Sequence, residues 1–332
     1  MSHDTLMMGV DAGGTSTRAV LMTTAGACIG YGVGGRGNPL SAGVDAAAEG
    51  VLDAIAQALV PSGRALADVS VISAAMAGQN SVDAEGGWLL DLLVTEGFAG
   101  RLTFESDLLA TYSSGAVEPI GYAVVAGTGA SAVRVADGRI EASSDGLGWL
   151  LGDRGSGFWI GHRVARAVVR DLDRAGPQTA LTGAVLDRLG ISADAGAADP
   201  GGAGRSRALD RIVEVLYAQR PIELAELAPL AFVPGDRVAD EILRRAGEHL
   251  ADSLTAVLRG RGPLVVGGSV LARPGPVRDA FLRRLGDAAT GLELRPVADG
   301  AVGAGLLALR AGGVAVSPET LATLDASLAR FR

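Results

Sequence analysis

The sequence Asp11-Ala12-Gly13-Gly14-Thr15-Ser16-Thr17-Arg18 decides how the N-terminal part of the chain folds. Apolar residues 6–10 precede it and apolar residues 19–22 follow it, so we predict a strand, a tight turn and a second strand. The two glycines let the backbone turn sharply and approach a ligand without a clash from a Cβ atom. Successive N–H groups in such a turn form a concave site for anions. The acid at the end of the first strand could hold Mg²⁺, which proteins bind through one or two carboxylates together with phosphate oxygens.

A simpler interpretation of this stretch is a glycine hairpin with a solvated Asp11, because short glycine motifs are weak evidence of function. The stretch is not a Walker A loop, since no Gly-Lys-Ser/Thr follows it. It is not a Rossmann fingerprint either, because a strand pattern resumes where a helix should begin. A phosphate site here therefore needs support from elsewhere in the chain.

The bulk properties of the chain predict an ordinary globular α/β protein. Its 332 residues correspond to about two domains. The net charge of −8 and the lack of a basic tract argue against nucleic acid or an anionic membrane as the main partner. No apolar run in the sequence is long enough to span a membrane, and residues 1–4 do not resemble a signal peptide, so we expect a cytoplasmic protein. Cys28 is the only cysteine, which excludes an intrachain disulfide, and we expect it to be buried on a strand.

Apolar periodicity divides most of the chain into helices and buried strands. Helices are predicted over residues 44–59, 158–172, 209–218, 222–230, 238–258, 277–285 and 318–331, with Ser41 as the N-cap of the first. Strands are predicted over residues 27–33, 69–74, 102–105, 121–126, 132–135, 263–266 and 292–294. Residues 78–80 and 192–204 are predicted to be loops.

A second acid, Asp107, follows the predicted strand 102–105 directly. A carboxylate at the carboxyl end of a strand lies where open α/β sheets bind their ligands. The residue also stands at the start of a predicted helix, where it could act only as an N-cap. The sequence alone leaves both roles open.

The opening pattern of strand, turn and strand recurs between residues 121 and 141. Gly127-Thr128-Gly129 forms the turn, and Asp137-Gly138 predicts a hairpin to a third strand. Two such halves could hold opposite ends of one polyphosphate. This repetition turns a weak motif into the hypothesis of a nucleotide site.

Two further glycine-rich stretches accompany the repeat. The segment 146–157 is too rich in glycine for regular structure, and we predict a buried, ordered loop that presents Asp153 to a site. Gly267-Gly268-Ser269 follows the predicted strand 263–266, and a flat ring could lie against its bare backbone.

Taken in order, these motifs resemble the sugar kinase, Hsp70 and actin superfamily. Within it the chain looks like the BadF/BadG/BcrA/BcrD ATPase group, whose best-understood members are N-acetylglucosamine kinases. The segment 146–162, GLGWLLGDRGSGFWIGH, is the most specific part of the resemblance. The resemblance implies two ribonuclease-H-like domains, residues 1–118 and 119–332, each with a mixed five-stranded sheet flanked by helices and with a cleft between them. It also allows the last helix, residues 317–331, to pack back on the N-terminal domain.

The resemblance implies ATP and Mg²⁺ as cofactors, an amino sugar as substrate and a homodimer as the assembly. It assigns the residues in four groups. They are Asp11 for Mg²⁺; Gly13, Gly14, Thr15, Gly127, Thr128, Gly129, Gly267, Gly268 and Ser269 for ATP; Asn38, Asp107, Gly146, Leu147 and Asp153 for the sugar; and Asp107 as the catalytic base.

The activity implied by the resemblance is transfer of the γ-phosphate of ATP to the 6-OH of an amino sugar, most simply N-acetylglucosamine. Leu40 and Leu147 replace aromatic residues of the animal enzymes, so glucosamine and N-acetylmuramic acid stay open as substrates. Leu40, Leu147 and Trp149 favour an acetylated sugar, whereas Asp145 would favour an ammonium group.

Two functions of other classes are alternatives. One is an ATP-driven activator that passes electrons to a dehydratase, but this role needs several cysteine ligands and the chain has one. The other is a sugar-sensing regulator. It lacks support because no helix-turn-helix extension, basic patch or set of zinc cysteines is visible.

Overall fold

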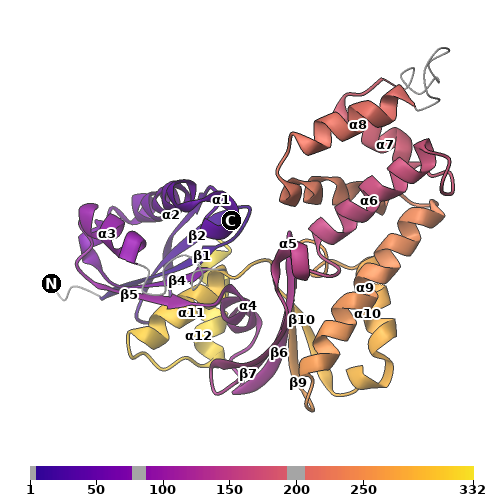
Figure 1. Ribbon diagram of the computed structural model, residues 1–332. Coiled ribbons are helices and arrows are strands. Elements are labelled where there is room, and N and C mark those ends of the chain that lie inside the picture. The colour runs from indigo at the N-terminus through magenta and orange to yellow at the C-terminus, as the bar shows by residue number, and fades with distance from the viewer. Residues whose placement is uncertain (1–4, 77–86, 193–205) are drawn as a thin grey trace.

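The computed structural model describes residues 5–76, 87–192 and 206–332. In these residues the chain forms two five-stranded sheets, with strand orders β3-β2-β1-β4-β5 and β10-β9-β6-β7-β8 (Figure 1). In each sheet three consecutive strands pair antiparallel, the first of them pairs in parallel with the fourth strand of that half, and the fourth pairs in parallel with the fifth. The two halves therefore repeat one plan, and the α/β fold with two mixed sheets flanked by helices is confirmed.

The first sheet consists of β1 (Leu6–Ala12), β2 (Thr17–Thr23), β3 (Cys28–Gly34), β4 (Val69–Met76) and β5 (Arg101–Glu105). Strand β1 is buried along its whole length, as expected for a central strand covered on both faces. Asp11 lies opposite Arg18 in the register of β1 and β2. It is the second-last residue of β1 and comes two residues before Gly13.

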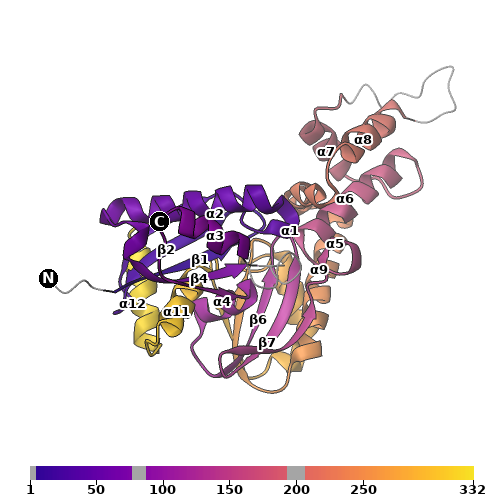
Figure 2. The same ribbon diagram turned by 60° about the vertical axis from the view of Figure 1, so that its left-hand side comes forward.

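Helices cover both faces of the first sheet (Figure 2). On one face α2 (Val44–Leu59) contacts β2 and β3, and α3 (Gly87–Thr95) lies beside it. On the other face lie α11 (Ala301–Ala311) and α12 (Pro318–Leu328), which come from the end of the chain. Glycines make these approaches close: a Cβ on Gly32 would lie 2.1 Å from the Ala54 carbonyl oxygen of α2.

The second sheet consists of β6 (Ile120–Ala126), β7 (Ala130–Ala136), β8 (Arg139–Asp145), β9 (Gly262–Gly267) and β10 (Leu292–Pro296). Helix α4 (Asp107–Gly115) covers one face, and α9 (Arg237–Val257) covers the other with α10 (Pro276–Leu285) packed against it. The predicted apolar stripe of α9 is buried at Ile242, Ala246, Leu250 and Leu254.

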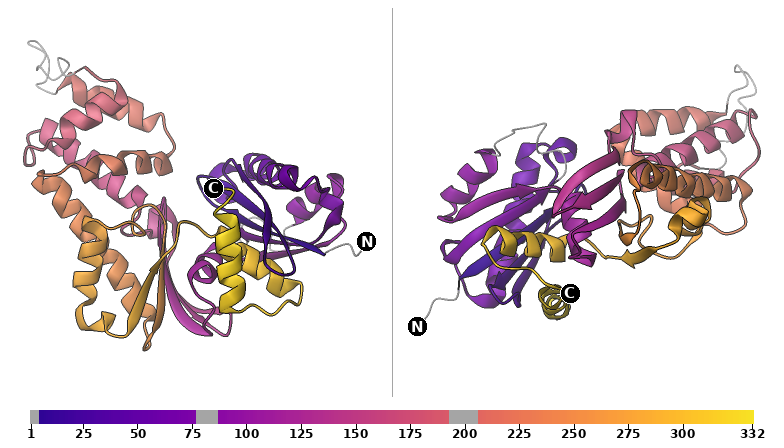
Figure 3. Two further views of the ribbon diagram at one scale, coloured as in Figure 1. Left: turned by 180° about the vertical axis from the view of Figure 1, so that it is seen from behind. Right: turned by 90° about the horizontal axis from the view of Figure 1, so that it is seen from below.

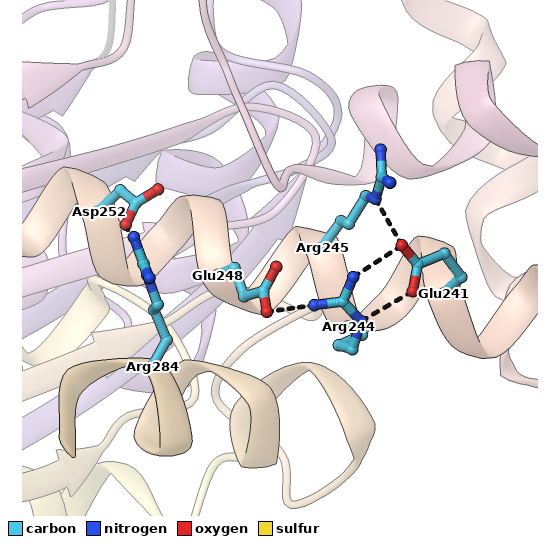
Figure 4. A network of polar contacts seen from close by, with 6 residues as sticks. All are labelled: Glu241, Arg244, Arg245, Glu248, Asp252 and Arg284. Carbon is cyan, nitrogen blue, oxygen red and sulfur yellow. Dashed lines mark hydrogen bonds and ion pairs between the residues drawn. The ribbon is translucent and has the colours of Figure 1, made fainter.

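The solvent side of α9 is charged (Figure 4). Glu241 pairs with Arg244 at 2.7 Å and with Arg245 at 2.6 Å, and Arg244 also pairs with Glu248. Arg284 of α10 pairs with Asp252 of α9 at 3.0 Å. Exposed pairs of this kind contribute about 0 to 1 kcal/mol each, so packing rather than charge holds the two helices together.

A lobe of helices is inserted between β8 and α9 and projects away from the second sheet (Figure 1). It contains α5 (Gly148–Leu151), α6 (Gly157–Leu172), α7 (Leu181–Leu189), α8 (Arg207–Tyr217) and the 3₁₀ segment η5 (Pro221–Phe232). Helix α6 packs closely on η5 at Gly161. A Cβ at this position would lie 1.8 Å from the Leu224 carbonyl oxygen, so only glycine allows this approach.

The two halves meet where α4 crosses α11 (Figure 3). A Cβ on Gly303 would lie 1.8 Å from the Ala110 carbonyl oxygen, and the Gly303 N–H donates to Ser114 Oγ at 2.8 Å. Each half thus covers part of the other: α4 comes from the first half and lies on the second sheet, whereas α11 and α12 lie on the first. Division of the chain between residues 118 and 119 stays a prediction.

The local predictions for this part of the chain had different outcomes. Ser41 is not the N-cap of α2, because residues Pro39–Ala42 form the short helix α1 and Gly43 precedes α2 without a side-chain cap. Cys28 is buried at the start of β3, as predicted. The predicted loop at residues 78–80, and the predicted loop at 192–204 apart from its first residue, lie outside the described residues. None of the helices in the described ranges combines the length and apolar composition needed to cross a bilayer.

Candidate active site

The first glycine turn, between β1 and β2, is held by its own backbone and by the segment that follows β3. The Gly13 N–H donates to the Ser16 carbonyl at 3.1 Å, and the Gly37 N–H donates to the Gly13 carbonyl at 3.0 Å. Thr17 Oγ1 donates to the Gly35 carbonyl at 2.9 Å. The turn and residues 35–37 therefore form one rigid unit, and Asn38 follows this unit directly.

Asp11 lies at the base of the first turn and is only 8% exposed. Its Oδ2 accepts a hydrogen bond of 3.0 Å from the Gly300 N–H at the start of α11. Burial, together with the nearby charges of Asp299 and Asp107, raises the pKa of Asp11 to about 7, although Arg18 acts in the opposite direction. Arg18 also pairs with Asp299 at 3.0 Å. Asp11 and Asp107 thus lie near enough to repel each other.

The setting of Asp11 fits a magnesium ion held between protein and phosphate. A desolvated carboxylate with a raised pKa is stabilised when a cation approaches it. Among the described residues no group of three or more His, Cys, Asp or Glu side chains could form a metal site by itself. Mg²⁺ is commonly held by one or two carboxylates together with phosphate oxygens and water, and Asp11 could be one such carboxylate.

Asp107 is the first residue of α4 rather than its N-cap. Ser106 caps the helix, with its Oγ accepting from the Leu108 N–H at 3.2 Å. The same N–H also donates to Asp107 Oδ1 at 3.0 Å. Burial raises the pKa of Asp107 above its usual value, and the Leu108 N–H and Ser106 act against that rise. Ser106 is thus the N-cap residue, and one oxygen of Asp107 shares the N–H that Ser106 caps.

The second glycine turn, between β6 and β7, is supported by the helical lobe. Gly127 donates its N–H to the Gly129 carbonyl at 2.9 Å. The Gly157 N–H at the start of α6 donates to the Gly127 carbonyl at 2.7 Å, and the next N–H, that of Phe158, donates to the Thr128 carbonyl at 3.1 Å. The N-terminus of α6 is thus bonded to the carbonyl side of the turn.

The two turns meet although they belong to different sheets. Thr15 Oγ1 and Thr128 Oγ1 are 3.5 Å apart. The structure therefore brings both predicted phosphate turns, Asp11 and Asp107 to one place between the halves.

The third predicted ATP segment adjoins the second turn. Gly268 follows β9 with a φ of +83°, and a Cβ there would lie 2.4 Å from the Ala126 carbonyl carbon. The Val270 N–H donates to the same Ala126 carbonyl at 2.9 Å. Gly267, Gly268 and Ser269 are thereby held beside Gly127, and glycine is required at position 268.

Asp145 orders the glycine-rich loop. Its Oδ1 accepts from the Gly146 N–H at 2.8 Å and from the Asp153 N–H at 2.6 Å, and its Oδ2 accepts from the Arg154 N–H at 2.9 Å. The sequence did not assign this role to Asp145. One feature of the sequence could have indicated it, namely an aspartate followed by glycine at the end of a predicted strand. Aspartate tolerates the left-handed backbone conformation that such a turn needs, and the φ of Asp145 is +64°.

Asp153, predicted to contact the sugar, has its carboxylate against the second turn. Its Oδ1 accepts from the Ala130 N–H at 3.2 Å, and a Cβ on Gly129 would lie 3.0 Å from its Oδ2. Burial and the neighbouring Asp145 raise the pKa of Asp153. The residue thus connects the glycine-rich loop to the phosphate turn.

The prediction that segment 146–157 is a buried loop was partly wrong. Asp153 is buried, but residues 148–151 form the one-turn helix α5, and Leu147, Leu150 and Leu151 are 67%, 73% and 77% exposed. The leucines are exposed because α5 follows β8, an edge strand, and no sheet covers them. Trp149 does pack on Phe158, with 5.7 Å between the ring centroids.

Comparison with known proteins identifies the family. The model of the BadF/BadG/BcrA/BcrD ATPase family matches residues 8–308. The chain belongs to this family. The match spans both glycine turns, Asp107, the glycine-rich loop and Gly268, so every segment of the candidate site lies inside it.

Curated relatives of this BadF/BadG/BcrA/BcrD ATPase are sugar kinases. The chain is 27% identical to the N-acetyl-D-glucosamine kinase of Dictyostelium discoideum over 92% of this chain and 98% of that protein. It is 25% identical to an N-acetylmuramic acid/N-acetylglucosamine kinase of Clostridium acetobutylicum (76% and 79%) and 25% identical to a glucosamine kinase of Vibrio cholerae (80% and 85%).

Solved structures share the two-domain fold of this family. A Chromobacterium violaceum structure, whose protein has a provisional N-acetylglucosamine kinase name, superposes with a TM-score of 0.72 at 25% identity over 92% of this chain and 99% of that one. A glucokinase of the ROK family from Streptomyces griseus, solved with glucose and AMPPNP, has a TM-score of 0.51 at 18% identity over 92% and 99%. The fold is thus that of the actin-like sugar kinases.

Proposed function

We propose that this protein is an ATP-dependent kinase that phosphorylates the 6-OH of an amino sugar, most simply N-acetylglucosamine. The observation that supports this best is the 3.5 Å contact between Thr15 and Thr128, because it brings two phosphate-binding turns together beside Asp11 and Asp107. Two anion-binding turns with an adjacent metal-ligand acid suit a polyphosphate, and a further acid suits deprotonation of an alcohol.

In this proposal Gly13, Gly14 and Thr15 hold one end of the triphosphate, and Gly127, Thr128 and Gly129 hold the other. Gly267, Gly268 and Ser269 offer bare backbone to the adenosine. Asp11 would hold Mg²⁺, which when bound neutralises charge on the phosphates. Phosphoryl transfer depends mainly on positioning and charge stabilisation, which these groups supply.

Asp107 accepts the proton of the attacking sugar hydroxyl. Its raised pKa makes it a stronger base than an ordinary aspartate, which suits proton abstraction from an alcohol. Asn38, Gly146, Leu147 and Asp153 bind the sugar hydroxyls and ring in this proposal. Asn38 adjoins the first turn and Asp153 the second, so the sugar would lie between the two phosphate-binding units.

The hydrogen bonds of Asp145 favour an acetylated sugar over a free amino sugar as the substrate. The sequence left this acid as a partner for an ammonium group, but its two oxygens accept three backbone hydrogen bonds. A carboxylate engaged in this way has little capacity left for a ligand. The exposed apolar surfaces of Leu147 and Trp149 are suitable for a methyl group.

The kinase proposal is tested by Asp107→Asn with ADP release as the readout. We expect kcat to fall by about 10²- to 10⁴-fold with a smaller change in KM. Asp210→Asn is a matched control, since Asp210 is also an acid in the first turn of a helix but is exposed on α8. Near-normal turnover by Asp107→Asn with every sugar would remove the base from the mechanism.

The substrate is tested by comparing N-acetylglucosamine, glucosamine, N-acetylmuramic acid and glucose in the same assay. We expect the highest kcat/KM for N-acetylglucosamine, with glucosamine lower by about tenfold or more, since one misplaced polar group in a pocket costs at least this much. A higher kcat/KM for glucosamine would reject the role given to Asp145.

Other properties belong to the same proposal. A homodimer in the cytoplasm is expected, and light scattering of the purified protein measures its mass. The position of Cys28 argues against the dehydratase-activator alternative. Cys28 is buried on β3, and burial raises its pKa to about 11. This disfavours the thiolate form that an iron–sulfur cluster needs.

A further inference from the structure

A cavity of about 690 Å³ lies along α4, and none of the residues of the two phosphate turns lines it. Its walls are one side of α4, the connection from α4 to β6, the hairpin between β7 and β8, and Arg310 at the end of α11. The volume is within the range of about 300 to 1,000 Å³ that is usual for small-molecule sites. We call this space the α4 cavity.

Five charged side chains line the α4 cavity. They are Glu105 at the end of β5, Glu118, Asp137 in the hairpin between β7 and β8, Arg139 at the start of β8, and Arg310. Burial raises the pKa of Glu105, whereas both arginines act to lower it, so both guanidinium groups lie within electrostatic reach of the carboxylate. In the described part of the chain neither arginine forms an ion pair with a carboxylate, which leaves most of their donors available.

The position of Arg310 is fixed by the β7–β8 hairpin. Its Nη1 donates to the Gly138 carbonyl at 3.4 Å, and a Cβ on Gly138 would lie 2.4 Å from that atom. Glycine at position 138 therefore leaves room for the guanidinium group, which reaches from α11, packed on the first sheet, to the hairpin of the second sheet.

The rest of the lining is mixed. Asp137, in the hairpin between β7 and β8, adds a second carboxylate, and Tyr112 and Ser113 of α4 add hydroxyl groups. Leu109, Val117 and Pro119 provide carbon surface. Glu118 is paired with Arg295 through bonds of 2.7 and 3.0 Å, which lower its pKa. A partly apolar wall with two guanidinium groups and the carboxylates of Glu105 and Asp137 is suited to a small organic molecule that combines an anionic group with hydrogen-bond donors.

We propose that the α4 cavity is a second binding site, specific for a phosphorylated sugar, in which Arg139 and Arg310 hold the phosphate and Glu105 accepts from a hydroxyl or amine of the sugar. Arginine pairs match the oxygens of phosphate in a bidentate way that lysine does not. The proposal rests on the proposed function for one point only, namely that a hexosamine 6-phosphate is chemically the product of that reaction.

Occupation of the α4 cavity would regulate turnover, because its two arginines lie on elements associated with different sheets. Arg139 is on the second sheet, and Arg310 is on α11, which packs on the first. A phosphate bonded to both fixes the angle between the halves, and thus the distance between the two phosphate turns. The ligand should therefore lower kcat without competing with either substrate.

The test is calorimetric titration of the full-length protein with glucosamine 6-phosphate, and in parallel with glucose 6-phosphate, inorganic phosphate and glucosamine. The variants are Arg139→Ala, Arg310→Ala, Glu105→Gln and, for the active site, Asp153→Ala. Arg101→Ala is the matched control, since Arg101 is exposed at the opposite end of the strand that ends in Glu105. Thermal melts establish that each variant is folded.

We expect the sugar phosphates to bind to wild type, to Arg101→Ala and to Asp153→Ala with similar affinity. Each arginine variant should bind about 10- to 100-fold more weakly, because each loses charged hydrogen bonds to phosphate. Glu105→Gln should weaken the sugar phosphates but not inorganic phosphate.

Three results would overturn the proposal. They are binding lost in Asp153→Ala and unchanged in the arginine variants, inorganic phosphate binding as tightly as the sugar phosphates, and no heat of binding at millimolar ligand. Binding is measured without turnover, so its loss leaves the kinase proposal intact, and failure of the kinase assay leaves the α4 cavity testable.

Discussion

The two glycine turns have the same local plan but different supports. The turn at Gly13 is bonded to residues 35–37 of its own sheet, and its acid, Asp11, is part of the strand that leads into it. The turn at Gly127 has no acid of its own; Asp153 reaches it from a distant loop, and the N-terminus of α6 is bonded to its carbonyls.

This difference shows how the site can be assembled from two rigid bodies. Any motion of the helical lobe must carry the second turn with it, because Gly157 and Phe158 are bonded to that turn. The first turn must move with the first sheet. Closure of the halves therefore changes the distance between Thr15 and Thr128 while it preserves the shape of each turn, as hinge motions of kinases generally do.

Among substitutions in the two turns and their supports, the largest effect is expected for Asp11, the acid of the first turn. Asp11→Asn removes the charge that would hold Mg²⁺, and we expect kcat to fall by about 10²- to 10³-fold, as for loss of one electrostatic stabiliser of a transition state. The same assay of Asp91→Asn, an exposed acid on α3, should match wild type.

Asp11→Asn should also change the pH dependence of stability. An aspartate in the unfolded chain loses its proton near pH 3.8, but the folded protein keeps this proton until about pH 7. The folded state binds more protons in that window, so Asp11 lowers the free energy of unfolding as the pH rises from 4 to 7, by about 4 kcal/mol at most. Without nucleotide, Asp11→Asn should exceed wild type in Tm at pH 8 and equal it near pH 4. Parallel Tm curves would assign the titration to another group.

The next effect concerns Asp145, which holds the loop that brings Asp153 to the second turn. Asp145→Ala leaves three N–H groups, including that of Asp153, without their acceptor. We expect a loss of about 2 to 4 kcal/mol in urea unfolding and a lower kcat/KM for both substrates. Asp145→Asn keeps one acceptor oxygen and should recover part of the loss. Unchanged stability in Asp145→Ala would show that water replaces the carboxylate.

A smaller effect distinguishes the support of the first turn. In Gly37→Ala the new Cβ would lie 2.3 Å from Thr17 Oγ1 and 2.8 Å from Ala12 Cβ, and we expect about 1 to 3 kcal/mol of destabilisation together with a higher KM for ATP. Gly35→Ala is the control, because its Cβ would make an ordinary 3.7 Å contact with Gly50. Equal effects of the two substitutions would contradict a specific role for Gly37.

The smallest effect is expected for the contact between the turns. Thr15→Val and Thr128→Val should each leave the free energy of unfolding within about 0.5 kcal/mol of wild type, because the contact is exposed. Both should raise the KM for ATP by similar factors if both hydroxyls bind phosphate. A change in one variant only would restrict phosphate binding to that turn.

The sequence predicted those features that depend on neighbouring residues. Apolar runs located the strands, and each strand–turn–strand repeat located a glycine turn, because the relevant residues are adjacent in the chain. Asp107 could be singled out for the same reason, since it lies two residues after the end of a strand, and its role as the base stays a proposal.

The supports of the turns could not be predicted in this way. Gly300 bonds to Asp11 from the far end of the chain, and Asp153 reaches Ala130 only because Asp145 folds the loop back. The exposure of α5 was missed because its leucines suggest burial, whereas an edge strand offers no second layer to cover them.

The origin of α11 and α12 has a consequence for synthesis on the ribosome. Met7, Val20 and Met22 of the first sheet belong to a buried cluster that residues of these two helices complete. During translation this face stays exposed to solvent until residues 301–328 have emerged, long after its own strands are complete. The nascent N-terminal half is therefore the stage at which this chain is most prone to aggregate and most dependent on chaperones.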